Sequence, residues 1–374
     1  MKFQVNKDVL SEAVSFAVRI LPVKNKQQIL SGILIEADAN ALRFSVFDYE
    51  VSAQAEVVAK VEESGRILVS SKFLSDIAAR LPNAPVEFEA AETKLLLSCG
   101  SSKFTLPLMD VEAYPTLPEL PAVNGTISGD TFSEAVAQVA MAASREDIPA
   151  WMTGVQIEAS KTEIAFTATD RYRVALREIA WQSSTTEDLS ALVPAKTLQE
   201  IAKTFANQPD ISIAIKSEEE RGMIAFKANN RSVTSQLIKE AARPVRGYFP
   251  QGSENYAIVA TQDLIDSTRR VSLVLDKTPA LKYSFADGSV TLEANESAQA
   301  SESISAELNG NPIVVMLKPQ FLIDALGACH TEFVKIAFTN NENPHKPGPV
   351  LITGHGAKDK SDSFKYLLQP NLLR

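Results

Sequence analysis

The fold is decided by a nine-residue stretch that occurs three times: FLSDIAARL at 73–81, TLQEIAKTF at 197–205 and FLIDALGAC at 321–329. The copies are 124 residues apart. In each one, apolar residues hold the second, fifth, sixth and ninth positions, which is the spacing of one face of an amphipathic helix. A helix that returns at a fixed interval predicts tandem copies of one structural unit.

A second helical pattern precedes each of these stretches. Its apolar stripe is Leu10, Ala13, Val14, Ala17, Val18 and Leu21; then Phe132, Ala135, Val136, Val139, Ala140 and Ala143; then Leu264, Ser267, Thr268, Val271, Ser272 and Leu275. Three small polar residues weaken the third copy. Asp8 and Asp130 precede the first two stripes, where a helix N-terminus favours a carboxylate, so we expect them to cap these helices.

Strands with alternating polarity lie between the two helices of each unit. They cover 42–47, 164–169 and 290–295, and each follows a turn-rich segment typical of a hairpin. Further strands are expected after the second helix, ending near 106–108, 236–238 and 366–368. Each unit therefore reads as helix, sheet, helix, sheet.

Prolines mark the boundaries between the units, at Pro115, Pro118 and Pro121 and again at Pro244 and Pro250. The sequence thus predicts three domains, 1–121, 122–250 and 251–374, each an antiparallel α+β domain with its helices on one face of the sheet. Tandem copies that fill a whole chain favour a symmetric, curved assembly over a single catalytic cleft.

Composition excludes several classes of protein. The chain has 374 residues, 45% of them apolar, and a formal net charge of −9. No run approaches the ~20 apolar residues of a membrane span, and the N-terminal residues lack the apolar core of a signal peptide, so a cytoplasmic protein is expected. Cys99 and Cys329 build neither a disulfide framework nor a metal site. The net negative charge argues against a nucleic-acid partner only if the charge is evenly spread over the surface.

No catalytic constellation is visible in the sequence. The three histidines, His330, His345 and His355, all lie in the last third, and the chain has no phosphate loop, nucleophile elbow, HExxH or CxxC motif. The acidic run 218–220 is interpreted as a solvated hairpin tip. We therefore expect a non-catalytic protein without metal or cofactor.

Basic residues gather on or just after the predicted helices. These candidates for a positive surface are Arg19, Lys24, Lys26, Lys72, Arg80, Arg145, Lys196, Lys203, Arg269, Arg270, Lys277 and Lys318. Helices commonly carry lysine and arginine near their C-termini, so any one copy is also compatible with an ordinary solvated face. If three copies point toward one centre, however, even a modest bias adds up to a positive lining.

Five segments resemble the bacterial DNA sliding clamp, the β subunit of DNA polymerase III. They are MKFQVNKDVLSEAV at 1–14, ILSGILIEA at 29–37, AYPTLPELP at 113–121, ATDRYRVAL at 168–176 and YLLQPNLLR at 366–374. Arg171 is more like the variants of high-GC Gram-positive bacteria. The resemblance implies a head-to-tail homodimer that closes into a ring around duplex DNA, with helices inside and sheets outside. A clamp must hold DNA without stopping on it, so scattered positive charge suits the task.

The resemblance also implies a hydrophobic pocket for short Gln/Leu/Phe-containing peptides. Carried over by position, it comprises Met152, Thr169, Arg171, Tyr172, Arg173, Val174, Pro244, Arg246, Tyr248, Leu367, Leu368, Gln369, Pro370 and Asn371. Here the linker AARPVRGYFP replaces the Phe-Pro-x-Tyr-Arg-Arg pattern of relatives, and Asn371 stands where methionine is frequent. The implied peptide donors are the polymerase alpha subunit, the clamp-loader delta subunit, repair and translesion polymerases, and ligase or mismatch-repair proteins.

The subunit contact is predicted from the unpaired strand edge that each end of such a chain leaves. We expect it to comprise Lys103, Leu106, Leu108, Leu273, Ser301 and Ile304. Two other functions stay open on the residues alone. One is a repeat-built hydrolase or transferase that uses Asp170, Arg171 and Arg173 in an interdomain cleft, and the other is an acidic peptide-binding scaffold that never encircles DNA.

Overall fold

The computed structural model describes residues 1–21, 27–146, 149–217, 222–250, 252–276, 280–295, 298–339, 348–356 and 363–372. The chain forms two compact units. Unit 1 contains Met1–Ser133 and Gln182–Lys239, and unit 2 contains Glu134–Trp181 and Glu240–Arg374. The middle repeat is therefore divided between the two units. Among the described residues, every helix is too short or too polar to span a bilayer.

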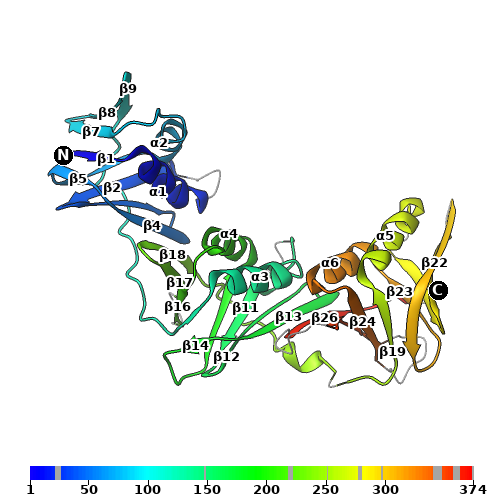
Figure 1. The fold of residues 1–374 in the computed structure, drawn as a ribbon. Coiled ribbons are helices and arrows are strands. Elements are labelled where there is room, and N and C mark those ends of the chain that lie inside the picture. The colour runs from blue at the N-terminus through cyan, green and yellow to red at the C-terminus, as the bar shows by residue number, and fades with distance from the viewer. Residues whose placement is uncertain are drawn as a thin grey trace. The chain divides into compact units, whose positions relative to one another are not determined.

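The element order repeats three times along the chain (Figure 1). The first repeat has β1 Lys2–Val5, α1 Lys7–Arg19, β2 Gly32–Asp38, β3 Ala41–Phe47, β4 Val51–Val58, β5 Lys60–Glu63, β6 Gly65–Ser70, α2 Ser71–Ala78, β7 Val86–Ala91, β8 Lys94–Cys99 and β9 Ser102–Pro107. The second has β10 Gly125–Ile127, α3 Gly129–Ala140, β11 Gly154–Ala159, β12 Glu163–Thr169, β13 Arg173–Ala180, β14 Gln182–Ser183, β15 Leu189–Pro194, α4 Ala195–Phe205, β16 Ile211–Lys216, β17 Met223–Ala228 and β18 Arg231–Gln236. The third has β19 Tyr256–Ala260, α5 Thr261–Val271, β20 Leu281–Ala286, β21 Ser289–Asn295, β22 Gln299–Asn309, β23 Ile313–Leu317, α6 Pro319–Cys329, β24 Phe333–Phe338, β25 Val350–His355 and β26 Ser363–Leu368. Short 3-10 turns follow the first helices at η1 Gln28–Ser31, η2 Ala150–Thr153 and η4 Ser272–Val274, and η3 Arg246–Tyr248 lies between the last two repeats.

This order confirms the predicted α+β repeat and extends it. Each repeat also has a strand before its first helix and three strands after its second. Strands β4 and β13 lacked a clean alternation because much of each is buried on both faces: consecutive residues are buried at 51–53 and at 173–177. A strand covered on both sides has no polar face to produce the period of two.

In unit 1, the last strand of the second repeat joins the sheet of the first repeat. The nine-stranded sheet has the order β14-β10-β16-β17-β18-β4-β3-β2-β6, and a five-stranded sheet has the order β5-β1-β7-β8-β9. Strands β18 and β4 pair antiparallel from Arg231↔Ala55 to Ser235↔Val51. A buried hydrogen bond of 2.7 Å joins the Ser52 and Thr234 hydroxyls across this seam.

Unit 2 contains the equivalent seam between the second and third repeats. Within this unit the strand order is β11-β12-β13-β26-β25-β24-β19-β22-β21-β20-β23. Strands β13 and β26 pair antiparallel from Arg173↔Leu368 to Glu178↔Ser363. In both units, then, the last strand of one repeat pairs with the third strand of the set that lies between the two helices of the preceding repeat.

The helices bury the apolar stripes that predicted them. In Figure 1, α1 and α2 lie side by side against the strands of unit 1, and α5 and α6 lie side by side in unit 2. Leu74, Leu198 and Leu322, the leading residues of the three stripes, are all fully buried. The predicted aspartate caps were wrong. Asn6 accepts the hydrogen bond from the Asp8 amide at 2.8 Å, and Ser128 accepts from the Thr131 amide, so the aspartates lie in the first turn instead.

Two of the three polar residues in the third stripe are buried without loss of hydrogen bonding. Ser267 and Thr268 are fully buried on α5. The Thr268 hydroxyl lies 3.2 Å from the Tyr283 hydroxyl, and the Ser267 hydroxyl donates to the Leu264 carbonyl at 3.3 Å. Because their partners are present, these residues preserve the helix packing that the sequence pattern indicates.

We expect Phe205→Ala to lower the free energy of unfolding by about 3–5 kcal/mol, because it empties a packed volume between the repeats of unit 1. Phe205 is 1% exposed and meets Phe16 of α1 edge-on, with ring centroids 5.8 Å apart. Urea unfolding followed by circular dichroism measures the change. Lys203→Ala, on the same helix but exposed, should change stability by less than about 0.5 kcal/mol, and equal effects of the two variants would contradict the packing.

Candidate functional site

Unit 2 contains a cavity of about 500 Å³ beside the turn between β12 and β13. Five segments surround it: the η2 turn, the β12–β13 turn, the linker before β19, the residue before β25 and the end of β26. Its lining is Pro149, Trp151, Met152, Thr169, Arg171, Tyr172, Arg173, Val174, Arg243, Val245, Tyr248, Pro349, Leu367 and Gln369. A mainly apolar cavity with a few polar groups is the usual form of a binding site.

The floor of the cavity is a small apolar cluster contributed by both repeats. Val174, Val245 and Leu367 are buried against each other, and Phe249 and Leu351 pack against them. Val174 and Leu367 are directly paired in the β13–β26 seam. The seam between the repeats therefore forms the bottom of the cavity.

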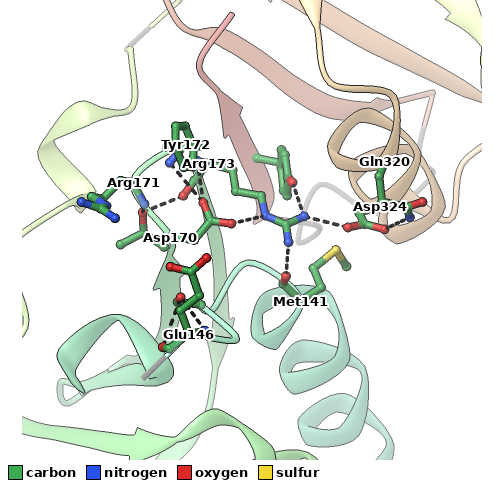
Figure 2. A network of polar contacts seen from close by, with 11 residues as sticks. Met141, Glu146, Asp170, Arg171, Tyr172, Arg173, Gln320 and Asp324 are labelled. Atoms are coloured by element: carbon green, nitrogen blue, oxygen red, sulfur yellow. Dashed lines mark hydrogen bonds and ion pairs between the residues drawn. The ribbon is translucent and has the colours of Figure 1, made fainter. Parts of the chain in front are cut away.

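One wall is fixed by Arg173, which is 7% exposed (Figure 2). Its Nε donates to Asp170 Oδ2 at 2.9 Å, its Nη1 to Asp324 Oδ2 at 2.7 Å and to the Tyr366 hydroxyl at 3.0 Å, and its Nη2 to the Met141 carbonyl at 2.6 Å. Gln320 holds the other oxygen of Asp324 at 2.7 Å. The guanidinium thus joins β13, α6, β26 and the end of α3.

Arg173 stays protonated in the folded protein. Burial acts to lower the pKa of Arg173, but Tyr366, Asp324 and Asp170 outweigh it and raise that pKa above its ordinary value. Burial raises the pKa of Tyr366, so its hydroxyl stays neutral. Removing either the buried guanidinium or one of its two carboxylates alone is costly, because the charges that remain lose their partner.

The β12–β13 turn is held by its own side chains. Asp170 Oδ1 accepts from the amides of Tyr172 and Arg173 at 3.1 and 3.2 Å. The Thr169 hydroxyl donates to the Arg173 carbonyl at 2.6 Å and accepts from the Arg171 amide at 3.2 Å. These bonds hold Arg171 at a φ of 79°, in the left-handed region that only glycine enters without cost.

Tyr172 forms the edge of the cavity and is half exposed. Its ring lies beside Phe321, with centroids 6.5 Å apart, and Lys318 Nζ lies 4.3 Å from the Tyr172 centroid and 4.9 Å from that of Phe321. A cation above two rings restrains their positions through cation–π attraction. Lys318, predicted to face DNA, therefore contacts the edge of this cavity.

Arg246 fixes the linker from outside the cavity. Its Nη2 donates to Glu163 Oε1 at 2.9 Å and to Glu178, while Nη1 lies 3.7 Å from Glu158 Oε2. These glutamates project from β11, β12 and β13. Lys365 on β26 adds a 3.1 Å bond to Glu178. The linker residues Val245 and Tyr248, on either side of Arg246, line the cavity.

The structure gathers most of the predicted pocket residues. Met152, Thr169, Arg171, Tyr172, Arg173, Val174, Tyr248, Leu367 and Gln369 line the cavity. Pro244, Arg246, Leu368, Pro370 and Asn371 do not. Arg246 turns to the glutamates, Leu368 and Pro370 are buried, and the Asn371 amide donates to the Met316 carbonyl at 2.8 Å, next to β23. The tail thus leaves the cavity after Gln369.

Sequence reasoning missed Pro149, Trp151, Arg243, Val245 and Pro349. The atypical linker accounts for two of them: the residues that enter the cavity are Arg243 and Val245, one position to either side of Pro244. Trp151, next to Met152 and one of only two tryptophans, was the signal available in the sequence. Pro349 enters through the fold of β25 and gives no local signal.

The predicted basic residues are mostly exposed on helices. In unit 1, Arg19 lies on α1, Lys72 on α2, and Lys196 and Lys203 on α4, while Arg80 follows the end of α2. Arg145, Arg269 and Arg270 lie in unit 2. Carboxylates pair with Arg80, Lys203, Arg269 and Arg270, through Asp76, Glu200, Asp266 and Glu302 respectively. Among the described ion pairs, none involves Arg19, Lys72, Arg145 or Lys196. Lys24, Lys26 and Lys277 lie outside the described residues, as do His345 and the run 218–220.

Three family profiles match the chain in succession: the N-terminal domain of the DNA polymerase III beta subunit at residues 1–118, the central domain at 126–244 and the C-terminal domain at 246–358. This chain belongs to the DNA polymerase III beta subunit family. Members of this family are sliding clamps, the non-catalytic processivity factors of replication. The predicted family is therefore confirmed.

The relatives agree with this assignment. The beta sliding clamp of Streptomyces coelicolor is 38% identical over 99% of both chains, and that of Micrococcus luteus is 41% identical over 82% of this chain and 100% of its own. Both support the expected likeness to high-GC Gram-positive proteins. The crystal structure of the sliding clamp from Bacillus subtilis covers 100% of both chains with a TM-score of 0.91 at 24% identity, which shows the shared fold.

We expect Arg246→Ala to lower the free energy of unfolding by about 1–2 kcal/mol at pH 7, because Glu178, whose side chain is 21% exposed, loses its strongest donor. Burial acts to raise the pKa of Glu178, but hydrogen bonds from Arg246 and Lys365 leave it below the ordinary value of 4.5. This stabilisation is complete above that value and is lost as the pH falls through the lower folded-state pKa.

Urea unfolding at pH 7, 5 and 3.5 measures the effect. The difference between wild type and Arg246→Ala should shrink from about pH 5 downward. Lys161→Ala, at an exposed turn of the same sheet, is the control and should match wild type throughout. A difference that stays constant from pH 7 to pH 3.5 would show that the ion pairs of Arg246 do not depend on ionised Glu178.

Proposed function

We propose that this chain is a cytoplasmic processivity factor that closes as a head-to-tail homodimer around duplex DNA and tethers its partners there. The observation that supports it is the seam that recurs between repeats. Strand β18 pairs with β4, and β26 pairs with β13. In the order of elements, β9 is the counterpart of β18 and β26, and β22 is the counterpart of β4 and β13.

Neither β9 nor the first half of β22 has its counterpart's partner within the described chain. Strand β9 is the edge of its sheet and pairs only with β8. Residues 299–305 of β22 pair with β21 on one side, while the β19 partner covers only 306–309. An open edge is a template for another strand. A third seam between two copies of the chain would cover both edges and, by symmetry, form twice.

The side chains beside these edges suit a contact between copies. Leu273 is 83% exposed in η4, and Phe104 is 37% exposed on β9. Lys103 and Ser301 are exposed, Leu108 and Ile304 are half-buried, and Leu106 is buried in its own sheet.

We expect Leu273→Asp to convert the dimer to a monomer, because it places an unpaired charge where an apolar side chain would be covered. Size-exclusion chromatography with light scattering at micromolar concentration measures the mass. Val58→Asp is the matched control, since Val58 is 80% exposed on the last residue of β4, away from the proposed contact. A dimer that survives Leu273→Asp would move the interface elsewhere.

The helices supply phosphate contacts of the kind that a sliding protein needs. Arg19, Lys72, Arg145 and Lys196 are exposed and distributed over separate elements rather than gathered on one recognition helix. Such contacts give attraction without base readout. The net charge of −9 leaves the rest of the surface unfavourable for DNA.

DNA retention should therefore be topological. We expect the loaded protein to stay on nicked circular DNA and to leave after linearisation, while equilibrium binding to short duplexes is weak and falls steeply with salt. Replacing Arg19, Arg145 and Lys196 by glutamine should shorten retention without changing the mass of the dimer. Gel filtration of protein on circular and cut plasmid measures both, and a sequence-specific footprint would contradict sliding.

The cavity in unit 2 is proposed to take short apolar peptides from the polymerase alpha subunit, the clamp-loader delta subunit, translesion and repair polymerases, ligase and mismatch-repair proteins. A hydrolase or transferase is not favoured. Asp170 and Arg173 are bonded to each other and to the turn, which leaves neither free for a reacting group, and the family is non-catalytic. We also propose domain boundaries at residues 121 and 250.

A further inference from the structure

The polar lining of the cavity has one sign of charge. Of the described residues that line it, three are arginines, Arg171, Arg173 and Arg243, and none is acidic. This contrasts with the chain as a whole, in which 46 acidic residues outnumber 37 basic ones. A local excess of positive charge around an apolar floor favours the binding of ligands that carry negative charge.

The three arginines differ in how far they are neutralised. Arg173 is matched by Asp170 and Asp324. Among the ion pairs of the described residues, none involves Arg171 or Arg243, and both are exposed. Asp170, next to Arg171 in sequence, already bonds two backbone amides and the Arg173 guanidinium. Within the described part of the chain, two cations at the cavity therefore have no carboxylate in an ion pair with them.

The backbone of Arg171 and the guanidinium of Arg243 are both restrained. Arg171 occupies the tip of a turn that four hydrogen bonds from Thr169 and Asp170 define, and Figure 2 shows its side chain directed away from the Arg173 network. The Arg243 guanidinium lies 5.6 Å from the Trp151 ring centroid. The Trp151 amide in turn donates to Glu240 Oε2 at 3.1 Å. A cation restrained in this way loses less entropy when it pairs with a ligand.

We infer that the cavity selects peptides in which acidic residues flank the apolar anchors. The apolar floor of Val174, Val245 and Leu367 favours a peptide over a nucleic-acid backbone as the occupant, and the two arginines then meet the flanking carboxylates. This inference rests on the proposed peptide-binding role and adds to it the chemistry of the preferred partner segment.

The test uses three labelled peptides with one Gln/Leu/Phe core and flanks of Asp, Asn or Lys, titrated by fluorescence anisotropy against the full chain. At about 50 mM salt we expect the Asp-flanked peptide to bind about fivefold more tightly than the Asn-flanked one, and the Lys-flanked one more weakly still. The preference should nearly vanish at about 500 mM salt, because exposed charges are then screened.

Variants assign the effect to the two arginines. Arg171→Gly removes the charge in a residue that tolerates a φ of 79°, and Arg243→Gln removes the other; together they should abolish the preference for the Asp-flanked over the Asn-flanked peptide. Arg171→Lys should keep most of the preference. Lys161→Gln, in the exposed turn before β12, controls for net charge and should leave the preference intact.

The outcomes separate the inference from the function on which it rests. Equal affinity for all three flanks, with the core peptide still bound, would overturn the inference and leave the peptide pocket standing. Binding of none of the peptides would overturn both. Displacement of the Asp-flanked peptide by a short DNA duplex in wild type, but not in Arg171→Gly/Arg243→Gln, would show that the arginines contact phosphate and would overturn the acidic-peptide assignment.

Discussion

The structure depends on the backbone hydrogen bonds that join the last strand of one repeat to a middle strand of the repeat before it. In unit 1 this seam is β18 with β4, and in unit 2 it is β26 with β13. A strand edge in water is satisfied by solvent, but an edge beside a buried apolar face needs a partner strand. Each repeat supplies an edge to its neighbour, so the repeats are held together by the same ladder that holds each one internally.

The cavity is a product of the second seam. Its floor comes from residues that face each other across β13 and β26. Its wall is fixed by Arg173, whose hydrogen-bond partners come from the β12–β13 turn, the residue after α3, α6 and β26. None of these elements could position the site alone. Arg246 performs the same task for the linker from the outer face, through glutamates on three adjacent strands. The geometry of the site therefore follows from the geometry of the join.

The sequence predicted the elements that have a local apolar periodicity. The helices α2, α4 and α6 followed from the stripes that begin at Leu74, Leu198 and Leu322, since each stripe is a local pattern that survives in any fold. Strands β4 and β13 did not, because burial on both faces removes alternation. Within the site, Thr169 to Val174 were found through their resemblance to a known motif. The Asp324 partner of Arg173 could not be found, because 151 residues separate them and only the strand order brings them together.

The division of the middle repeat between the two compact units follows from these seams. A segment cut at the linkers would contain the second repeat entire in sequence, yet it would expose β18 without β4 and β13 without β26. Both edges carry buried side chains, so such a fragment would offer two adhesive surfaces to solvent. A cut inside the second repeat, between β13 and β15, would do no better, because it leaves β4 without β18 and β13 without β26. For this protein, neither a single repeat nor a fragment cut inside the second repeat is a natural piece for expression and crystallisation.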